Sequence, residues 1–464
     1  MGDAEVGGRL LLERLHVRAE DEHAALDHRG DGGLDPPVQG PPLAAQVHQG
    51  HAHAPQGTAR RPTWRYPAQV SPPPALVSDA AGVDAVVAAV RAAGTCALDT
   101  EFLWEKTYAP VLCLAQIAVG EETWLIDPVA GAPLEPIADL VRDPAVEKLM
   151  HAPSADLIAF GLHFGAVPAN VFDTQIAAGF VGLTAGAGLD RLLDQVLRVR
   201  LSHDETFSDW SRRPLTDTQC LYAADDVGHL AALVAELRRR LDERGRGAWA
   251  QAEIERRFCT PEAAGADPER SWRKVQRRGR LSPTAQAILV DVAAWRERAA
   301  RRRDQPTAWV MKDPTVVEIA RAAPRTADDL RRIRGVGKGF AGREADELLA
   351  AVEAGLGRTP PPSEPSVPQR VARRVEAVAT LAVPMARIRC LDQDLAPELV
   401  ATRADLDRFL EAVVIGEGVD DLPLGQGWRR ELLGDDLIRL AAGEVVLSMN
   451  HEAPYLRIEE RPAG

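Results

Sequence analysis

The sequence lacks long apolar runs and has few cysteines, and both absences narrow the class of protein. No run of about 18 apolar residues occurs, so no membrane-spanning helix is expected. The N-terminus has no basic segment followed by an apolar one, so a secretory signal peptide is not expected either. Five cysteines among 464 residues are far apart and form no Cys-x-x-Cys pair. We therefore predict reduced, structural thiols and a cytoplasmic protein.

Positive charge is also in deficit, but it is unevenly distributed. The 55 lysines and arginines are outnumbered by 68 aspartates and glutamates, and the net charge of −13 argues mildly against a nucleic-acid partner. From residue 269 to residue 303, however, 11 basic residues face only 3 acidic ones. A basic patch on an acidic protein can still follow a phosphate backbone. We predict that this segment contacts nucleic acid through Arg273, Lys274, Arg277 and Arg278. The alternative is a charged spacer that only faces solvent.

Composition divides the chain into segments. Residues 1–70 are rich in Gly, Pro, His and Ala without sustained periodicity, which predicts a disordered extension. A proline-rich linker is expected at 359–368. Between these segments, mixed strand and helix patterns give way to helix and turn patterns alone. We expect one α/β domain followed by two small all-helical domains, with boundaries at 71–255, 281–358 and 369–458.

Hydrophobic periodicity places the elements of the first domain. Strands are expected at 95–100, 112–119, 123–126 and 147–151. Helices are expected at 81–93, 154–164, 174–180, 189–197 and 216–244. Helices interleaved with strands are typical of an α/β layer fold. Ser154 is expected to cap the second of these helices, and Thr216 with Gln219 fits a capping box.

Four acidic residues and a tyrosine lie on three of these elements. Asp99 and Glu101 are two apart on a strand, so both side chains leave the same face. Tyr222 and Asp226 are four apart in a helical pattern and share a helix face. Asp156 belongs to the first turn of another helix. If the fold brings these carboxylates together, cations must neutralise them, and oxygen ligands favour Mg²⁺ or Mn²⁺.

The ordered set Asp99-x-Glu101, Asp156 and Tyr222-x-x-x-Asp226 resembles the DEDD exonuclease superfamily, in its tyrosine-bearing branch. The phrases at 172–177 and 208–215 are similar to the ribonuclease D family in particular. Residues 289–298 and the turn at 330–337 are similar to an HRDC domain, a helical nucleic-acid-binding module. Residues 427–432 resemble a degenerate second copy. The resemblance implies a ribonuclease H-like α/β exonuclease domain followed by two HRDC-type domains.

The same resemblance implies a mechanism and a substrate. Asp99, Glu101, Asp156 and Asp226 would hold two divalent ions, Mg²⁺ or Mn²⁺, and Tyr222 would orient or deprotonate the attacking water. The implied enzyme is a metal-dependent 3′-5′ exoribonuclease that releases 5′-nucleoside monophosphates from tRNA precursors and other structured RNA. We expect a monomer. The alternatives are a DNA 3′-5′ exonuclease and a non-catalytic nucleic-acid-binding protein.

Three further residues compete for a place in the metal site. Asp225 lies three residues from Tyr222 and nearly on the same helix face, but the family spacing favours Asp226. Asp173 is expected to anchor its own turn. His151 is expected to be packed or hydrogen-bonded, because hard divalent ions prefer oxygen ligands.

Overall fold

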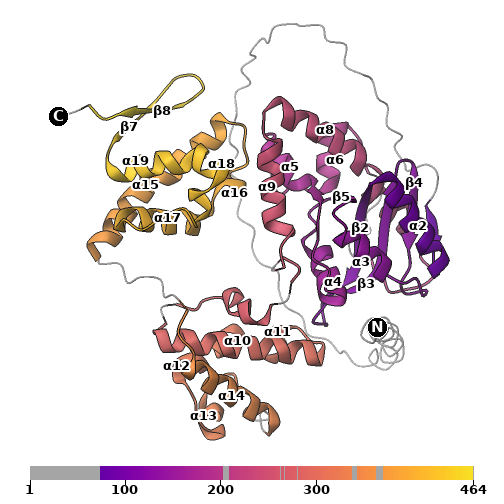
Figure 1. Ribbon diagram of the computed structural model, residues 1–464, viewed down its shortest axis with the longest axis horizontal. Coiled ribbons are helices and arrows are strands. Elements are labelled where there is room, and N and C mark those ends of the chain that lie inside the picture. Colours follow the sequence, from indigo (N-terminus) through magenta and orange to yellow (C-terminus); the bar gives the residue numbers. More distant parts are fainter. Residues whose placement is uncertain are drawn as a thin grey trace, which may run out of the picture.

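The computed structural model describes residues 74–201, 208–261, 263–265, 267–279, 281–336, 342–361 and 369–462 of the chain. The predicted N-terminal extension and residues 362–368 of the predicted linker lie outside the described residues. Figure 1 shows an α/β domain, a helical unit around α10, and a C-terminal unit around α15. The predicted fold class is confirmed for the α/β domain and the first helical domain. No helix in the described part of the chain combines the length and apolarity that a bilayer crossing needs.

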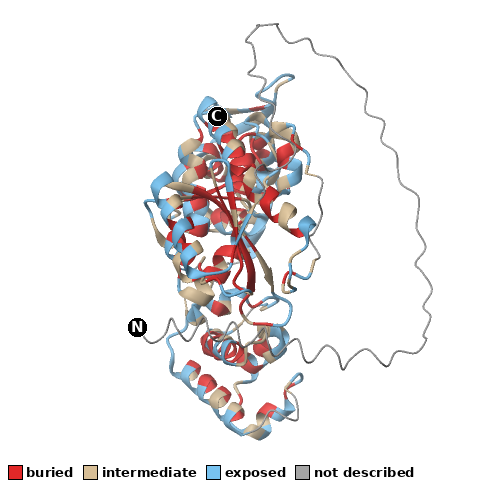
Figure 2. Cartoon of the chain, turned by 90° about the vertical axis from the view of Figure 1, so that its right-hand side faces the viewer, coloured by how far each residue is buried: buried red, intermediate tan, exposed pale blue. Residues whose placement is uncertain are grey.

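A six-stranded mixed sheet organises the first domain, with strands in the order β1-β4-β3-β2-β5-β6. Central strand β2 pairs antiparallel with β3 and parallel with β5. Figure 2 shows that buried residues concentrate along these central strands. The two short strands at the edges of the sheet were not predicted. The strands are β1 (Ala75–Val77), β2 (Thr95–Leu103), β3 (Val111–Val119), β4 (Glu122–Ile126), β5 (Glu147–Met150) and β6 (Val171–Asp173).

Helices surround this sheet, and most of them begin and end where the pattern predicts. The single helix expected at 216–244 is instead two helices that meet at His229. Ser154 is the first residue of its helix, and Pro153 occupies the cap without a side-chain bond. The capping box of Thr216 and Gln219 is confirmed. The helices are α2 (Ala80–Ala93), α3 (Glu135–Arg142), α4 (Ser154–Phe164), α5 (Thr174–Phe180), α6 (Leu189–Leu197), α7 (Asp217–Gly228), α8 (Leu230–Glu243) and α9 (Gly247–Phe258).

The first helical unit has a core of its own. Long helix α10 packs against α12, α14 and the 3₁₀ helix η2, and Trp295 is buried among them. Gly355 allows α14 to lie close to the backbone of α10, because a Cβ there would lie 2.5 Å from Ile288 Cα. The chain that leads from α8 into this unit contains both α9 and η2. The elements are η2 (Pro268–Lys274), α10 (Pro283–Arg303), α11 (Thr307–Val310), α12 (Asp313–Ala322), α13 (Ala327–Arg332) and α14 (Arg343–Gly357).

The C-terminal unit combines helices with a β-hairpin that the helical prediction for 369–458 missed. The helices are α15 (Gln369–Asp392), α16 (Pro397–Val400), α17 (Arg403–Ile415), α18 (Gly427–Arg429) and α19 (Asp435–Ala442), joined by the 3₁₀ turn η3 (Pro423–Gly425) and the π-helical turn η4 (Arg430–Gly434). The hairpin consists of β7 (Val445–Met449) and β8 (Leu456–Glu460). A single hydrophobic core runs from the α/β domain into this unit. The identification of this unit as a degenerate second HRDC-type domain stays a prediction.

Aromatic and ionic contacts join the C-terminal unit to α5 and α9. The ring of Trp428 stacks on Trp249, with centroids 5.5 Å apart, and meets Phe180 edge-on at 5.0 Å. Fully buried Glu253 accepts a hydrogen bond of 2.7 Å from Arg429, which also donates to backbone carbonyls at the end of α16. The C-terminal unit is therefore packed as part of the α/β domain.

Candidate active site

Strand β2 presents the first two acidic residues on one face at the centre of the sheet. Asp99 pairs in register with Gln116 of β3, and Glu101 pairs with Leu114. The register shifts directly after Glu101, between Glu101 and Phe102. Such an irregularity bends a strand and re-aims its side chains, and it is common beside active sites.

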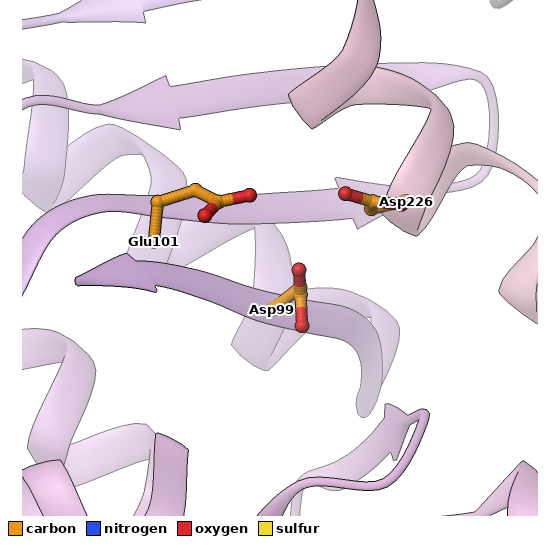
Figure 3. A group of neighbouring side chains, drawn as sticks. All are labelled: Asp99, Glu101 and Asp226. Atoms are coloured by element: carbon orange, nitrogen blue, oxygen red, sulfur yellow. The ribbon is translucent and has the colours of Figure 1, made fainter. Parts of the chain in front are cut away.

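Helix α7 supplies the third carboxylate from across the sheet face. Asp226 points toward the two acids of β2, as Figure 3 shows. One carboxylate oxygen from each of Asp99, Glu101 and Asp226 lies within 4.8 Å of the others. Tyr222, one turn earlier on α7, donates a hydrogen bond to Asp226. Two residues 127 positions apart in sequence, Asp99 and Asp226, therefore meet through the packing of α7 on β2 and β3.

Asp156 lies beside this group but is not part of the 4.8 Å cluster. It is buried in the first turn of α4, and its Oδ1 accepts a hydrogen bond of 2.5 Å from Thr100 Oγ1. Thr100 stands between the two acids on β2, so the bond ties α4 to the same strand. The charge of Asp156 still reaches the cluster, because it contributes to raising the pKa of Glu101. Its role as a metal ligand remains a prediction.

Electrostatic repulsion within the site is strong. Burial, followed by the charges of Asp226 and Asp156, raises the pKa of Glu101 to about 9. Burial and then the charge of Asp225 raise the pKa of Asp226 to about 7, although the hydrogen bond from Tyr222 lowers it. The pKa of Asp99 also lies well above its usual range, because of burial and then the neighbouring carboxylates. Carboxylates held this close favour a bound cation, which would relieve the repulsion.

The donor set fits a hard divalent ion. All three clustered ligand atoms are carboxylate oxygens, which suit Mg²⁺, Mn²⁺ or Ca²⁺ better than soft metals. The described residues contain no other group of three His, Cys, Asp or Glu side chains with this spacing. The sequence prediction of a divalent-metal site is thus supported by the cluster, whereas the number and kind of ions are not decided by it.

Asp127, Trp210 and Arg213 hold α7 and Tyr222 in place. No role was predicted for these three residues from the sequence. The guanidinium of Arg213 donates twice to the buried carboxylate of Asp127 at 2.6 Å and also to Cys113 O and Trp210 O. Trp210 is buried and packs on Tyr222, with ring centroids 6.0 Å apart. The sequence did contain a signal for them, because the segment 208–215, which is similar to the ribonuclease D family, includes both Trp210 and Arg213.

The competing residues have structural partners. Asp173 caps α5 through Gln175 N–H and also accepts from Ala152 N–H, so the prediction that it anchors its own turn is confirmed. His151 Nδ1 lies 2.8 Å from Thr174 Oγ1, and burial lowers the pKa of this histidine to about 4. The prediction of a packed, hydrogen-bonded histidine is therefore also confirmed. Asp225 is buried and does not belong to the carboxylate cluster.

The predicted nucleic-acid-binding residues lie in η2 and in the turn that follows it. The guanidinium groups of Arg273 and Arg278 stack over the ring of Trp272, with centroid distances of 5.7 and 5.2 Å. Lys274 instead lines a cleft that faces the α/β domain. Arg277 has a positive φ of 55° in the turn that follows. Their contact with nucleic acid remains a prediction.

Two known families match this chain, one in the α/β domain and one in the first helical unit. Residues 74–242 match the family described as 3′-5′ exonuclease, and residues 285–352 match the HRDC domain. The first match contains all five predicted catalytic residues, and the second contains most of α10, all of α11 to α13 and most of α14.

Individual proteins match nearly the whole described chain. Ribonuclease D of Acidiphilium cryptum is 36% identical over 82% of this chain and 96% of its own length. Ribonuclease D of Gluconacetobacter diazotrophicus is 37% identical over 82% of this chain and 95% of its own length. The crystal structure of Escherichia coli RNase D, titled an exoribonuclease involved in structured RNA processing, matches with a TM-score of 0.66 at 30% identity. That match covers 80% of this chain and 99% of the E. coli chain.

Proposed function

The chain belongs to the ribonuclease D family and is a 3′-5′ exoribonuclease, and we propose that Asp99, Glu101, Asp156 and Asp226 are its metal ligands. The observation that carries the proposal is the meeting of three carboxylate oxygens within 4.8 Å. We propose two divalent ions, Mg²⁺ or Mn²⁺, because paired ions are the usual apparatus for phosphodiester hydrolysis. When bound, such ions supply an activated water and stabilise charge on the leaving oxygen.

The protein's own residues position the reacting groups in this proposal. Asp99 and Glu101 are fixed by the pairing of β2 with β3, and Asp226 by the packing of α7. Asp156 is held beside them by the hydrogen bond that it accepts from Thr100, the residue between the two acids of β2. Tyr222 orients the attacking water through its hydroxyl, which the contact with Trp210 and the bond to Asp226 hold toward the site.

The substrate is RNA, and we propose the 3′ ends of tRNA precursors and other structured RNAs as its particular targets. The HRDC domain supports this, because a nucleic-acid-binding module beside the exonuclease domain can hold the body of a folded RNA. We also propose a cytoplasmic enzyme that acts as a monomer. The five cysteines, all free in the structure, support the reducing compartment.

Digestion of matched RNA and DNA oligonucleotides tests the proposed activity. Each 5′-labelled strand is incubated with Mg²⁺, with Mn²⁺ or with a chelator, and Asp99→Asn serves as the inactive control. We expect the RNA to shorten stepwise from its 3′ end only when a metal is present, with release of 5′-nucleoside monophosphates. Preferential digestion of DNA would support the alternative of a DNA exonuclease, and no digestion of either strand would support a binding protein without catalysis.

A further inference from the structure

A cleft of about 570 Å³ lies between the end of strand β2 and the first helical unit. This unit, from η2 to α14, contains the HRDC domain and is called the HRDC unit below. Its walls come from both domains: Trp104 and Tyr108 belong to the segment after β2, whereas Lys274 and Lys312 belong to η2 and to the turn before α12. Trp104 follows Glu101 by three residues, which is roughly 10 Å of extended chain. The cleft therefore begins close to the proposed metal site.

Hydrogen bonds between the two domains hold the aromatic wall in place. Tyr108 donates its hydroxyl hydrogen to Glu297 of α10 at 2.8 Å, and its N–H donates to Asp304 at 3.3 Å. The indole Nε1 of Trp104 in turn donates to Tyr108 O at 3.1 Å. This chain of bonds fixes the indole while leaving the residue 42% exposed. A large aromatic ring is thus held open to solvent beside the active-site strand.

Positive charge is in excess in the cleft lining, which contains Lys274, Arg296 and Lys312 against Glu297 and Asp313. Asp313 pairs with Arg296 at 2.7 Å and also accepts from Gln276 N–H, whereas the partner of Glu297 is the uncharged hydroxyl of Tyr108. Among the described residues, neither Lys274 nor Lys312 forms an ion pair with an acidic side chain. Lys312 also borders a second groove along α12 and α13, so the positive wall continues onto the HRDC unit.

We propose that this cleft binds the single-stranded RNA segment on the 5′ side of the scissile bond. A base stacks on the indole of Trp104, and Lys274 and Lys312 contact the phosphates beside it. Stacking on an aromatic ring accepts every base, which suits an enzyme that shortens RNA of varied sequence. The inference rests on the proposed function, because the 3′ end in the metal site sets the direction in which the strand leaves.

Equilibrium binding of the full-length protein to a labelled oligouridylate tests this subsite without requiring catalysis. The oligonucleotide has about ten nucleotides, within the span of a single-strand binding groove, and all solutions contain a chelator so that it stays intact. We expect Trp104→Ala to weaken binding at least about fivefold, the lower end of base–aromatic stacking. Trp104→Phe should recover most of the affinity, because a stacking ring remains.

Two controls distinguish a binding role from a structural one. Trp309→Ala removes an indole that is 60% exposed but does not line the cleft. Its affinity should stay within about twofold of the parent, a smaller change than the loss of one base–aromatic stack would cause. Arg408→Gln removes an exposed cation from α17 and should be equally mild. If Trp104→Phe binds as weakly as Trp104→Ala, or if Trp104→Ala binds like the parent, the stacking proposal is overturned.

The salt dependence of binding tests the two lysines separately. Each phosphate contact on a single strand contributes about 0.7 to the slope of log K against log salt. Lys274→Gln and Lys312→Gln should each reduce the slope by about that amount, and Arg408→Gln should not. An unchanged slope in the double lysine variant would show that neither lysine contacts phosphate. These binding results do not depend on turnover, so a failure of the exonuclease assay would be seen independently.

Discussion

At the scale of single residues, the site depends on which of two neighbouring aspartates faces the metal. Asp226 lies with Asp99 and Glu101 in the carboxylate cluster, whereas Asp225, at the preceding position of α7, is buried outside it. One residue on a helix turns the side chain by about 100°, so adjacent residues cannot serve the same site equally. Sequence spacing alone places both aspartates near the face of Tyr222. The direction of their side chains in the structure favours Asp226.

Asparagine substitutions at both positions test this distinction. Asp226→Asn keeps the shape but removes a charged ligand, so we expect turnover to fall by more than about 100-fold, beyond the 10- to 100-fold typical of groups that only support a ligand. Asp225→Asn should be milder in activity. Single-turnover rates of both variants at saturating Mn²⁺ provide the measurement. A larger loss for Asp225→Asn would reverse the assignment.

Tyr222 offers a second test at this scale. Its hydroxyl bonds Asp226, and its ring packs on Trp210, so Tyr222→Phe removes the hydroxyl while keeping the packing. We expect the single-turnover rate to fall by about 100-fold or more, as is usual for a lost proton-transfer or water-orienting group. Mn²⁺ affinity, followed by calorimetry, should change little. A rate equal to that of the parent would show that Tyr222 only packs against the sheet.

At the scale of elements, a close backbone contact decides how the connector around Ala264, between α9 and η2, packs on the α/β domain. Gly161 on α4 faces the backbone at Ala264, where an added Cβ would lie 1.9 Å from the carbonyl oxygen. A backbone atom cannot move aside as a side chain can. The absence of a side chain at this position therefore allows the connector to lie against α4.

Substitution of this glycine should loosen the packing of the connector. We expect Gly161→Ala to lower the free energy of unfolding by about 1–3 kcal/mol, the usual cost of overpacking. Gly186→Ala is the matched control, because an added Cβ there meets no atom within 4 Å. Urea unfolding of the two variants measures the difference. Equal stability would mean that the connector does not hold this position in solution.

At the scale of the whole molecule, one buried carboxylate joins the α/β domain to the C-terminal unit. Burial alone would raise the pKa of Glu253, but hydrogen bonds from Arg256 and the charge of Arg429 lower it to about 2. An unfolded glutamate titrates near pH 4.3. The folded state therefore binds this proton less readily than the unfolded state does. Its stabilising contribution is present above about pH 4.3 and is lost as the pH falls through about 2.

Glu253→Gln tests this connection. Near pH 7 we expect the variant to lose about 3 kcal/mol of stability, because Arg429 is left buried without its carboxylate. The difference in unfolding free energy between parent and variant should shrink as the pH is lowered from about 4.3 toward 2. Glu243→Gln, which removes a surface carboxylate that pairs with Arg239 on α8, is a suitable control. A difference that is independent of pH would contradict the depressed pKa.

Much of the fold and of the candidate site could be predicted from the sequence, because it depends on local patterns. The apolar run before Asp99 predicts a buried strand, and alternation along that strand places Glu101 on the same face. The capping box at Thr216 marks the start of the helix that carries Tyr222 and Asp226. These features involve neighbours within a few residues, so periodicity and capping chemistry are sufficient to show them.

Only the tertiary structure decided which distant groups meet. The bond of Asp156 to Thr100 joins residues 56 positions apart, and the burial of Glu253 against Arg429 joins residues 176 positions apart. The cleft brings Trp104 and Lys312 together across 208 positions. The break of the expected long helix at His229 and the C-terminal hairpin were likewise seen only in the structure. A local sequence pattern contains no information on such pairings, because their energies arise from surfaces that meet only after the chain has folded.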